Sequence, residues 1–234
     1  MSLHPLFTLG ERLRLCASMV RPGCMLADIG TDHAYLPIWL ARQGLIARAV
    51  AADVKEGPLQ KAQFHIERYD VRDMVSARLS NGLDSISPLE ADDIVIAGMG
   101  GETMIQIISK ATWLKDQNKH LILQPMTTVP PLRVFLAEQG FAALREQAVR
   151  QDGHVYSAFL AVYEPDKVDT GTLYPYIGKL DAATEDNRLY IRHCAETLGK
   201  KANGLALSGK EEEAAPFRAV IEKLNAMLKE EEAR

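Results

Sequence analysis

A glycine loop near the N-terminus is the first feature of this sequence that could bind a ligand. The segment Asp28–Asp32 follows the short apolar run Met25–Asp28 and precedes a helix-like stretch. Gly30 lets the backbone approach a ligand closely. A dinucleotide-binding fingerprint needs a second glycine where this chain has Asp32. That carboxylate would repel a pyrophosphate, so the loop favours a cationic ligand; a tight turn in which Thr31 or Asp32 caps the next helix is the alternative.

Polar residues also follow the next two predicted strands. Asp53 ends the apolar run Arg48–Asp53, where an acid is placed to bond ribose hydroxyls. Asn81 and Gly82 follow the run Val75–Leu79, and an amide there can read an adenine edge. Each feature alone could be a surface cap or an ordinary turn. Together and in order they favour S-adenosylmethionine, which contains adenosine and carries both an ammonium and a sulfonium.

A second glycine-rich segment follows the apolar run Asp93–Ala97. It consists of Gly98, Met99, Gly100 and Gly101. Glycines allow a flat group to come close to the backbone and leave N–H groups pointing into a site. We therefore predict cofactor contacts here, and the alternative is a junction required only for packing.

The acceptor side of such a site would use few acid–base groups. Methyl transfer from a sulfonium to a ring nitrogen is an in-line displacement that depends on positioning and charge stabilisation. Asp32, His33 and Tyr35 are the candidate catalytic residues, although a lone histidine is more often structural and Tyr35 could simply pack on the sheet. Gln124 could bond a base edge or, equally, be a buried side chain that satisfies loop backbone.

The elements that position these residues alternate regularly. Near-continuous apolar runs predict parallel strands buried on both faces, with a helix after the first, second, fourth and fifth of them. The predicted strands are Met25–Asp28, Arg48–Asp53, Val75–Leu79, Asp93–Ala97 and His120–Gln124. The predicted helices are Tyr35–Gln43, Pro58–Tyr69, Glu102–Thr112 and Pro131–Glu138.

The pattern changes in the last third of the chain. Phe141–Arg150 and Val155–Tyr163 are strand-like and are joined by Asp152-Gly153, a strong hairpin signal. A parallel sheet that ends in an antiparallel hairpin is typical of Rossmann-like class I methyltransferase folds, which makes a dehydrogenase the least favoured function.

A helical hairpin is predicted after a linker at Pro165–Pro175. It comprises Ile177–Lys201 and Glu211–Glu231, with the turn signals Asn203-Gly204 and Ser208-Gly209 between them. These helices either pack on the sheet as a solvated pair or contact a macromolecule. We therefore predict an α/β methyltransferase domain at 1–165 and a C-terminal helical domain at 166–234.

Composition sets further limits. The 234 residues are 47% hydrophobic and 25% charged, which excludes collagen-like, disordered and disulfide-scaffold classes. With 27 Lys+Arg against 31 Asp+Glu the net charge is −4, so any nucleic-acid binding must use a local basic patch. Three cysteines without metal-ligand spacing and no long apolar run predict a cytoplasmic protein with no membrane segment and no metal.

Four motifs resemble the bacterial tRNA (adenine(22)-N(1))-methyltransferase family. They are A-D-I-G-T-D-H-A-Y-L-P (Ala27–Pro37), I-A-G-M-G-G (Ile96–Gly101), L-I-L-Q-P (Leu121–Pro125) and D-G-H-V-Y (Asp152–Tyr156). A short N-terminal helix at Arg12-Leu13 and the C-terminal helical pair are similar too. The resemblance implies a seven-stranded Rossmann-like domain with a coiled-coil-like C-terminal domain, S-adenosylmethionine as donor, and tRNA methylated on N1 of an adenine in the D-arm region.

The resemblance also implies site residues. Cofactor contacts are expected at Asp28, Gly30, Asp53, Asn81 and Gly98–Gly100, to which we add Thr31 and Gly82 of the same loops. Asp32, His33 and Tyr35 are the conspicuous motif residues on the acceptor side. Phosphate contacts are expected among Arg12, Arg14, Lys179, Arg188, Arg192, Lys200 and Lys201, unless these are solvated or salt-bridged. Arg188 and Arg192 are i,i+4 neighbours on one helix face.

Two other functions remain open from the sequence. One is a methyltransferase with a small-molecule or protein acceptor, which would need a closed acceptor pocket. The other is a noncatalytic tRNA-binding protein that keeps a methyltransferase-like fold. We expect a monomer or a weak homodimer.

Overall fold

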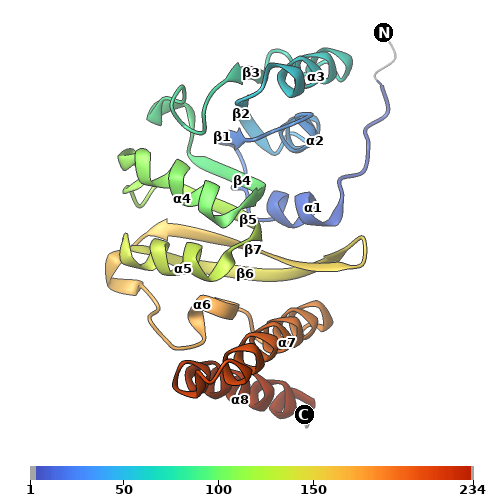
Figure 1. Cartoon of the computed structure of the whole chain (residues 1–234). Coiled ribbons are helices and arrows are strands. Elements are labelled where there is room, and N and C mark those ends of the chain that lie inside the picture. Colours follow the sequence, from blue (N-terminus) through green and yellow to red (C-terminus); the bar gives the residue numbers. More distant parts are fainter. Residues whose placement is uncertain (1–3, 233–234) are drawn as a thin grey trace.

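A seven-stranded sheet forms the centre of the protein in a computed structural model that describes residues 4–232 (Figure 1). The strand order is β3-β2-β1-β4-β5-β7-β6, and all neighbours are parallel except β7, which is antiparallel to β5 and β6. The strands are β1 (Cys24–Ile29), β2 (Ile46–Asp53), β3 (Val75–Leu79), β4 (Asp93–Gly100), β5 (His120–Thr127), β6 (Phe141–Gln151) and β7 (His154–Tyr163). The predicted Rossmann-like methyltransferase sheet is confirmed.

Helices cover both faces of this sheet (Figure 1). α1, α2 and α3 lie on one face, and α4 and α5 lie on the other. The C-terminal helices α6, α7 and α8 pack beside the β6–β7 end. Their bounds are α1 (Glu11–Ala17), α2 (Tyr35–Arg42), α3 (Glu56–Arg68), α4 (Gly101–Lys110), α5 (Val129–Glu138), α6 (Tyr174–Ile177), α7 (Glu185–Leu207) and α8 (Glu211–Glu232). Short 3₁₀ turns lie at Pro88–Glu90, Thr112–Leu114 and Pro165–Lys167.

The apolar runs became strands because both faces of the sheet are buried. Within β1, Leu26 belongs to the core on the side of α1, α2 and α3, whereas its neighbour Ala27 belongs to the core on the side of α4 and α5. Ile94, Val95 and Ile96 of β4 are all completely buried. Successive strand residues alternate between two covered faces, so an unbroken apolar pattern is required.

The antiparallel hairpin forms as its turn signal predicts. Asp152 and Gly153 have φ of +51° and +77°, and Gln151 pairs with His154 across them. Two central residues with positive φ define the turn class that matches the twist of a two-residue hairpin. β7 therefore returns into the sheet between β5 and β6.

The two central strands extend further than predicted. The apolar pattern of β4 ends at Ala97, yet its pairing with β5 continues to Gly100, which faces Thr127. The register shifts around Met99, so the ladder continues through a local irregularity. The expectation that the glycines follow the strand as a loop is therefore wrong for Gly98 and Gly100, which lie within it.

The predicted helix at Ile177–Lys201 is also wrong in its limits. α6 ends at Ile177, Gly178 has a φ of +57°, and α7 begins only at Glu185. Thr184 caps α7 by accepting a hydrogen bond from the Asn187 amide at 3.1 Å. The helix then continues through Asn203-Gly204 to Leu207, because its buried side carries Leu198 and Ala202 against α8.

A buried ion pair joins the C-terminal helices to the sheet. Arg133 of α5 and Glu146 of β6 form an ion pair, and their side chains are 1% and 0% exposed. Arg133 also donates to the carbonyls of Pro175 and Tyr176 at 3.1 and 2.7 Å. Glu146 accepts the Lys179 amide at 2.9 Å. α6 and the turn that follows it are thereby tied to the same pair.

Candidate functional site

The glycine loop lies where the order of strands in the sheet reverses. β1 pairs with β2 on one side and with β4 on the other. From the carboxyl end of β1 the chain therefore continues into one half of the sheet and enters the other half only later. The amides of Gly30 and Thr31 both donate to the Ala52 carbonyl of β2, at 2.8 and 3.0 Å. In open α/β sheets this reversal leaves a crevice in which ligands bind.

The loop has an unusual backbone. Gly30, Asp32 and Ala34 all have left-handed φ, at +73°, +52° and +57°. For the two non-glycine residues this conformation costs roughly 1–2 kcal/mol each. Strain of this kind clusters at functional sites. The capping alternative for Thr31 and Asp32 is wrong, because Ala34 occupies the N-cap of α2.

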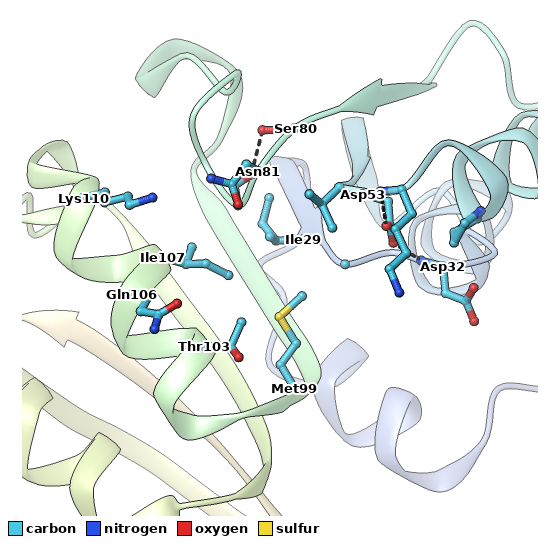
Figure 2. A pocket seen from close by; sticks show the side chains of 15 residues that line it. Ile29, Asp32, Asp53, Ser80, Asn81, Met99, Thr103, Gln106, Ile107 and Lys110 are labelled. Carbon is cyan, nitrogen blue, oxygen red and sulfur yellow. Dashed lines mark hydrogen bonds between the residues drawn. The ribbon is translucent and has the colours of Figure 1, made fainter.

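A first cavity of about 310 Å³ opens on the β2 side of this loop (Figure 2). Asp53 lines it at the end of β2, where its carboxylate accepts the Lys55 and Asp32 amides at 3.0 and 3.3 Å. Ile29 and Ile107 supply apolar wall from opposite sides. The cavity therefore combines an oriented acid with a slot for a flat apolar group.

The Asn81 loop closes the far end of this cavity. Asn81 donates from its amide to the Asp84 carboxylate at 3.0 Å. Ser80 shapes the turn by donating its hydroxyl to the Gly82 carbonyl at 2.8 Å and accepting the Ser85 amide. A Cβ on Gly82 would lie 2.8 Å from Ile107, so glycine is required for this close approach to α4.

A second cavity of about 300 Å³ lies on the other side of the loop. Gly30 and Asp32 line both cavities, so the two meet at the loop. The remaining lining of the second cavity comes from Arg12, Leu13, Asp28, Thr31, His33, Tyr35, Leu36, Ala97, Gly98 and Met126. A Cβ on Gly30 would lie 2.0 Å from the Met99 methyl, which covers this glycine.

Asp28 is a buried acid in the second cavity. Burial raises the pKa of Asp28 to about 6, and the nearby Asp53 carboxylate acts in the same direction. The Thr31 hydroxyl opposes this by donating a hydrogen bond to the carboxylate at 2.5 Å. A buried anion of this kind suits a cationic ligand group, whose charge would favour the ionised form.

Residues 9–159 match a family model described as a methyltransferase domain. The protein belongs to this family. The match covers the glycine loop, both cavities and most of the terminal hairpin.

Individual methyltransferases resemble most of the chain. A Bacillus subtilis (strain 168) protein named tRNA (adenine(22)-N(1))-methyltransferase is 29% identical over 198 residues, which cover 81% of each chain. A crystal structure of a Streptococcus pneumoniae protein, described provisionally as a tRNA (m1A22) methyltransferase, has a TM-score of 0.83 at 29% identity and covers 94% of this chain and 100% of its own. The same S. pneumoniae protein in complex with S-adenosyl-L-methionine has a TM-score of 0.79 at 28% identity, covering 93% and 99%.

The residues of the glycine-rich segment of this methyltransferase, Gly98–Gly101, have two different roles. Gly98 lines the second cavity with φ of +76°, and Met99 lines the first. The Gly98 amide donates to Gln124 at 3.1 Å rather than pointing into the site. A Cβ on Gly100 or Gly101 would lie 3.0 and 2.3 Å from β5 and the turn after it, so these two glycines serve the packing of β4 and α4.

Gln124 connects several parts of the site through hydrogen bonds. It is completely buried, and its carbonyl oxygen accepts both the Gly98 amide and an Arg12 guanidinium N–H, the latter at 2.9 Å. Its amide donates to the Pro125 carbonyl at 3.1 Å. The structure therefore favours the second interpretation of Gln124, which satisfies loop backbone and does not reach a base edge. Arg12 lines the second cavity, and its contact with the substrate stays a prediction.

Three aromatic rings gather at the mouth of the second cavity. The His33 and Tyr35 ring centroids are 5.2 Å apart and nearly parallel, and His65 of α3 lies 5.2 Å from Tyr35. His33 Nε2 is 3.5 Å from the Asp32 carboxylate. The part of the chain that the structure describes gives the buried His33 Nδ1 no hydrogen-bond partner. The structure thus brings all three predicted catalytic residues to one rim.

The two predicted arginines of α7 have different surroundings. Arg188 turns back to the start of its helix, where it donates to the Ala182 carbonyl at 2.8 Å and pairs with Glu185. Arg192 lines a groove between α7 and the β6–β7 hairpin. Other candidate cations are engaged within the protein: Arg14 with Glu11, Lys179 with Asp169, and Lys201 over the Phe217 ring.

Sequence reasoning missed one wall of the first cavity. Thr103, Gln106, Ile107 and Lys110 all point into it from α4 (Figure 2). Their i, i+3, i+4, i+7 spacing on the helix that follows a glycine-rich strand is the signal that could have found them. Ser80 was also missed, since a serine before Asn-Gly gives no indication of its hydrogen bonds. Within residues 4–232 no cluster of three metal-ligating side chains is found.

No helix within residues 4–232 has both the length and the apolar character that are needed to cross a bilayer.

Proposed function

We propose that this methyltransferase transfers a methyl group from S-adenosylmethionine to N1 of an adenine in tRNA, at position 22 in the D-arm region. The observation that carries the proposal is the pair of cavities meeting at Gly30, one with Asp53 and Asn81 and the other with Asp28. The B. subtilis relative, which is named for this reaction, supports the choice of acceptor.

The residues present fit the donor. The first cavity offers an apolar slot between Ile29 and Ile107 for adenine, and Asp53 at the strand end for ribose hydroxyls. Gly30 has no room for a Cβ, which leaves the backbone close to the junction of the cavities. The buried Asp28 carboxylate in the second cavity suits an ammonium group. The donor supplies an electrophilic methyl group on a sulfonium.

The acceptor side works by orientation and charge. Tyr35 is 37% exposed at the rim and can stack on an adenine, with His33 and His65 holding its ring in place. The adenine becomes a cation when N1 takes the methyl group. Asp32, whose side chain is 64% exposed beside His33, stabilises that charge as it develops.

The decisive experiment is methyl transfer from labelled S-adenosylmethionine to unmodified bulk tRNA, followed by nuclease digestion to nucleosides. Label in 1-methyladenosine is the expected result. A tRNA with adenine 22 replaced by guanine is the matched control and should lose the label. Donor binding without transfer to any RNA would overturn the proposal and support the noncatalytic alternative.

Asp53→Ala is expected to weaken donor binding about 10- to 100-fold, because a hydrogen bond to a charged group contributes roughly 1.5–3 kcal/mol. Titration calorimetry with S-adenosylhomocysteine measures this directly. Asp116→Ala removes an exposed acid outside both cavities and should bind normally. An unchanged dissociation constant for Asp53→Ala would contradict the ribose assignment.

The proposal includes three further points. We place the enzyme in the cytoplasm, where tRNA is modified; the free thiols of Cys16, Cys24 and Cys194 agree with a reducing compartment. We divide the chain functionally at 165/166, with residues 166–234 as the unit that extends the tRNA surface. We expect a monomer or weak homodimer, which sedimentation velocity tests.

A further inference from the structure

A groove of about 690 Å³ lies between the tip of the β6–β7 hairpin and α7. We call it the hairpin groove. Its lining includes Arg150, His154 and Tyr156 from the hairpin and Arg192 and His193 from α7. It has more than twice the volume of either cavity described above, about 310 and 300 Å³, and is therefore large enough for a nucleotide. Nothing in the proposed transfer reaction uses it.

The hairpin groove continues from the acceptor side of the site. Met126 lines both the groove and the second cavity. Arg12 bridges the two, with its guanidinium carbon 5.2 Å from the Tyr156 ring centroid and Nη1 3.3 Å from the Met126 sulfur. The Arg12 amide is fixed to the Gln151 side chain at 3.1 Å. In Figure 1 the hairpin lies between α1 and α7.

The lining of the groove has the chemistry of a nucleic-acid contact. Arg150, Arg192, His154 and His193 can donate to phosphate, and Glu196 is the carboxylate among the lining residues. Arg150 is held in place by Asp186 of α7 at 2.7 Å. Tyr156 offers a ring face, and a base stacks on such a face whatever its identity.

We infer that the hairpin groove binds the nucleotide next to the methylated adenine, with its base on Tyr156 and its phosphate at Arg150 and His154. The inference rests on the proposed tRNA methylation and adds a residue-level contact to it. Met126 lines both spaces, so a strand whose target adenine occupies the second cavity can continue past it into the groove. The D-G-H-V-Y turn therefore acts as part of the substrate surface.

The test combines a protein change with an RNA change. Tyr156→Leu keeps apolar volume and removes the flat ring, and it should raise the KM for tRNA roughly tenfold while the donor dissociation constant stays unchanged. A tRNA with an abasic nucleotide on one side of the target adenine should show the same loss with the wild-type enzyme. Combining the two should cost no more than either alone, because both remove one stacking contact. Each flanking position is tested in turn.

Matched variants separate stacking from loss of structure. Tyr156→Phe keeps the ring and should behave as wild type. Phe217→Leu removes another ring that lies under a cation, 4.4 Å from the Lys201 nitrogen but outside the groove, and should leave the KM unchanged. Arg150→Gln should lower the slope of log binding constant against log salt by about 1. Arg218→Gln, which breaks the Arg218–Glu211 pair on α8, should not.

The outcomes distinguish the two proposals. If the wild-type enzyme methylates tRNA, either of two results would overturn the groove assignment alone. One is a wild-type KM for Tyr156→Leu. The other is that the losses from Tyr156→Leu and from the abasic nucleotide are additive at both flanking positions. Loss of donor binding in Tyr156→Leu would also overturn it, by making the ring a support of the donor site. A wild-type protein that binds donor but methylates no RNA would remove both proposals.

Discussion

Replacing Glu146 with alanine is expected to lower the free energy of unfolding by about 3–5 kcal/mol, because it leaves the Arg133 guanidinium buried without its counter-charge. Arg133 is 1% exposed at its side chain, so water cannot replace the lost partner. The Lys179 amide loses its acceptor at the same time. Urea unfolding followed by far-UV circular dichroism measures the change.

A double replacement provides the control. Glu146→Leu combined with Arg133→Met removes both charges and fills the space with apolar groups, which should recover most of the stability. The carbonyls of Pro175 and Tyr176 lose their donor, so recovery should be incomplete. A loss below about 1 kcal/mol in Glu146→Ala would show that the pair is not a structural link. Limited proteolysis of the single variant should cut first around α6, which is tied to the pair.

Asp28→Asn is expected to change how stability depends on pH. Burial raises the pKa of Asp28 in the folded protein to about 6, against 3.8 for the ordinary value. The folded state therefore holds its proton more tightly than the unfolded chain, and stability falls as pH rises from about 4 to above 6. The full difference is about 3 kcal/mol. Between pH 5 and 8 the wild type should lose about 1 kcal/mol that the variant retains.

The comparison uses the change in the free energy of unfolding between two pH values. Any pH-independent effect of the amide introduced by Asp28→Asn therefore cancels. Urea unfolding of both proteins at pH 5 and pH 8 gives the double difference. Asp92→Asn, which alters a less buried acid at the opposite end of the strands, is the matched control. A wild-type profile identical to that of Asp28→Asn would contradict the raised pKa.

The raised pKa of Asp28 also predicts how donor affinity varies with pH. A cationic ligand group in the second cavity favours ionised Asp28, so binding should weaken as pH falls through about 6. Asp28→Asn should bind the donor less tightly and without this dependence. The acid that lowers the stability of the free protein above pH 6 would then be the one that holds the ligand.

The central strands, the hairpin and the glycine loop were predictable because their signals are local. An apolar run buried on two faces and an Asp-Gly turn of positive φ are both legible over a few residues. The predicted donor residues Asp53 and Asn81 line one cavity because strand ends meet at one edge of a parallel sheet. For these features, spacing along the chain was sufficient.

The misplaced features depend on distant partners. The break at Gly178 exists because a Cβ there would lie 1.8 Å from Glu146, far back in the sequence. Gln124 became internal because Arg12, 112 residues earlier, reaches it. No pattern within a short window contains these two contacts. Arg188 differs, since its partner Ala182 is nearby in the sequence, but helical periodicity alone does not reveal a bond back to the start of the helix.

The order in which the chain is synthesised determines when the mouth of the second cavity is completed. The Arg12 amide is anchored by Gln151, which is 139 residues later. At roughly 5–20 residues per second, α1 leaves the ribosome about 7 to 28 s before that anchor is made. A nascent chain that already holds β1 to β4 and α4 contains every residue that lines the first cavity. Its second cavity still lacks a fixed Arg12, so the acceptor side of the site is completed after the cavity proposed for the adenosine part of the donor.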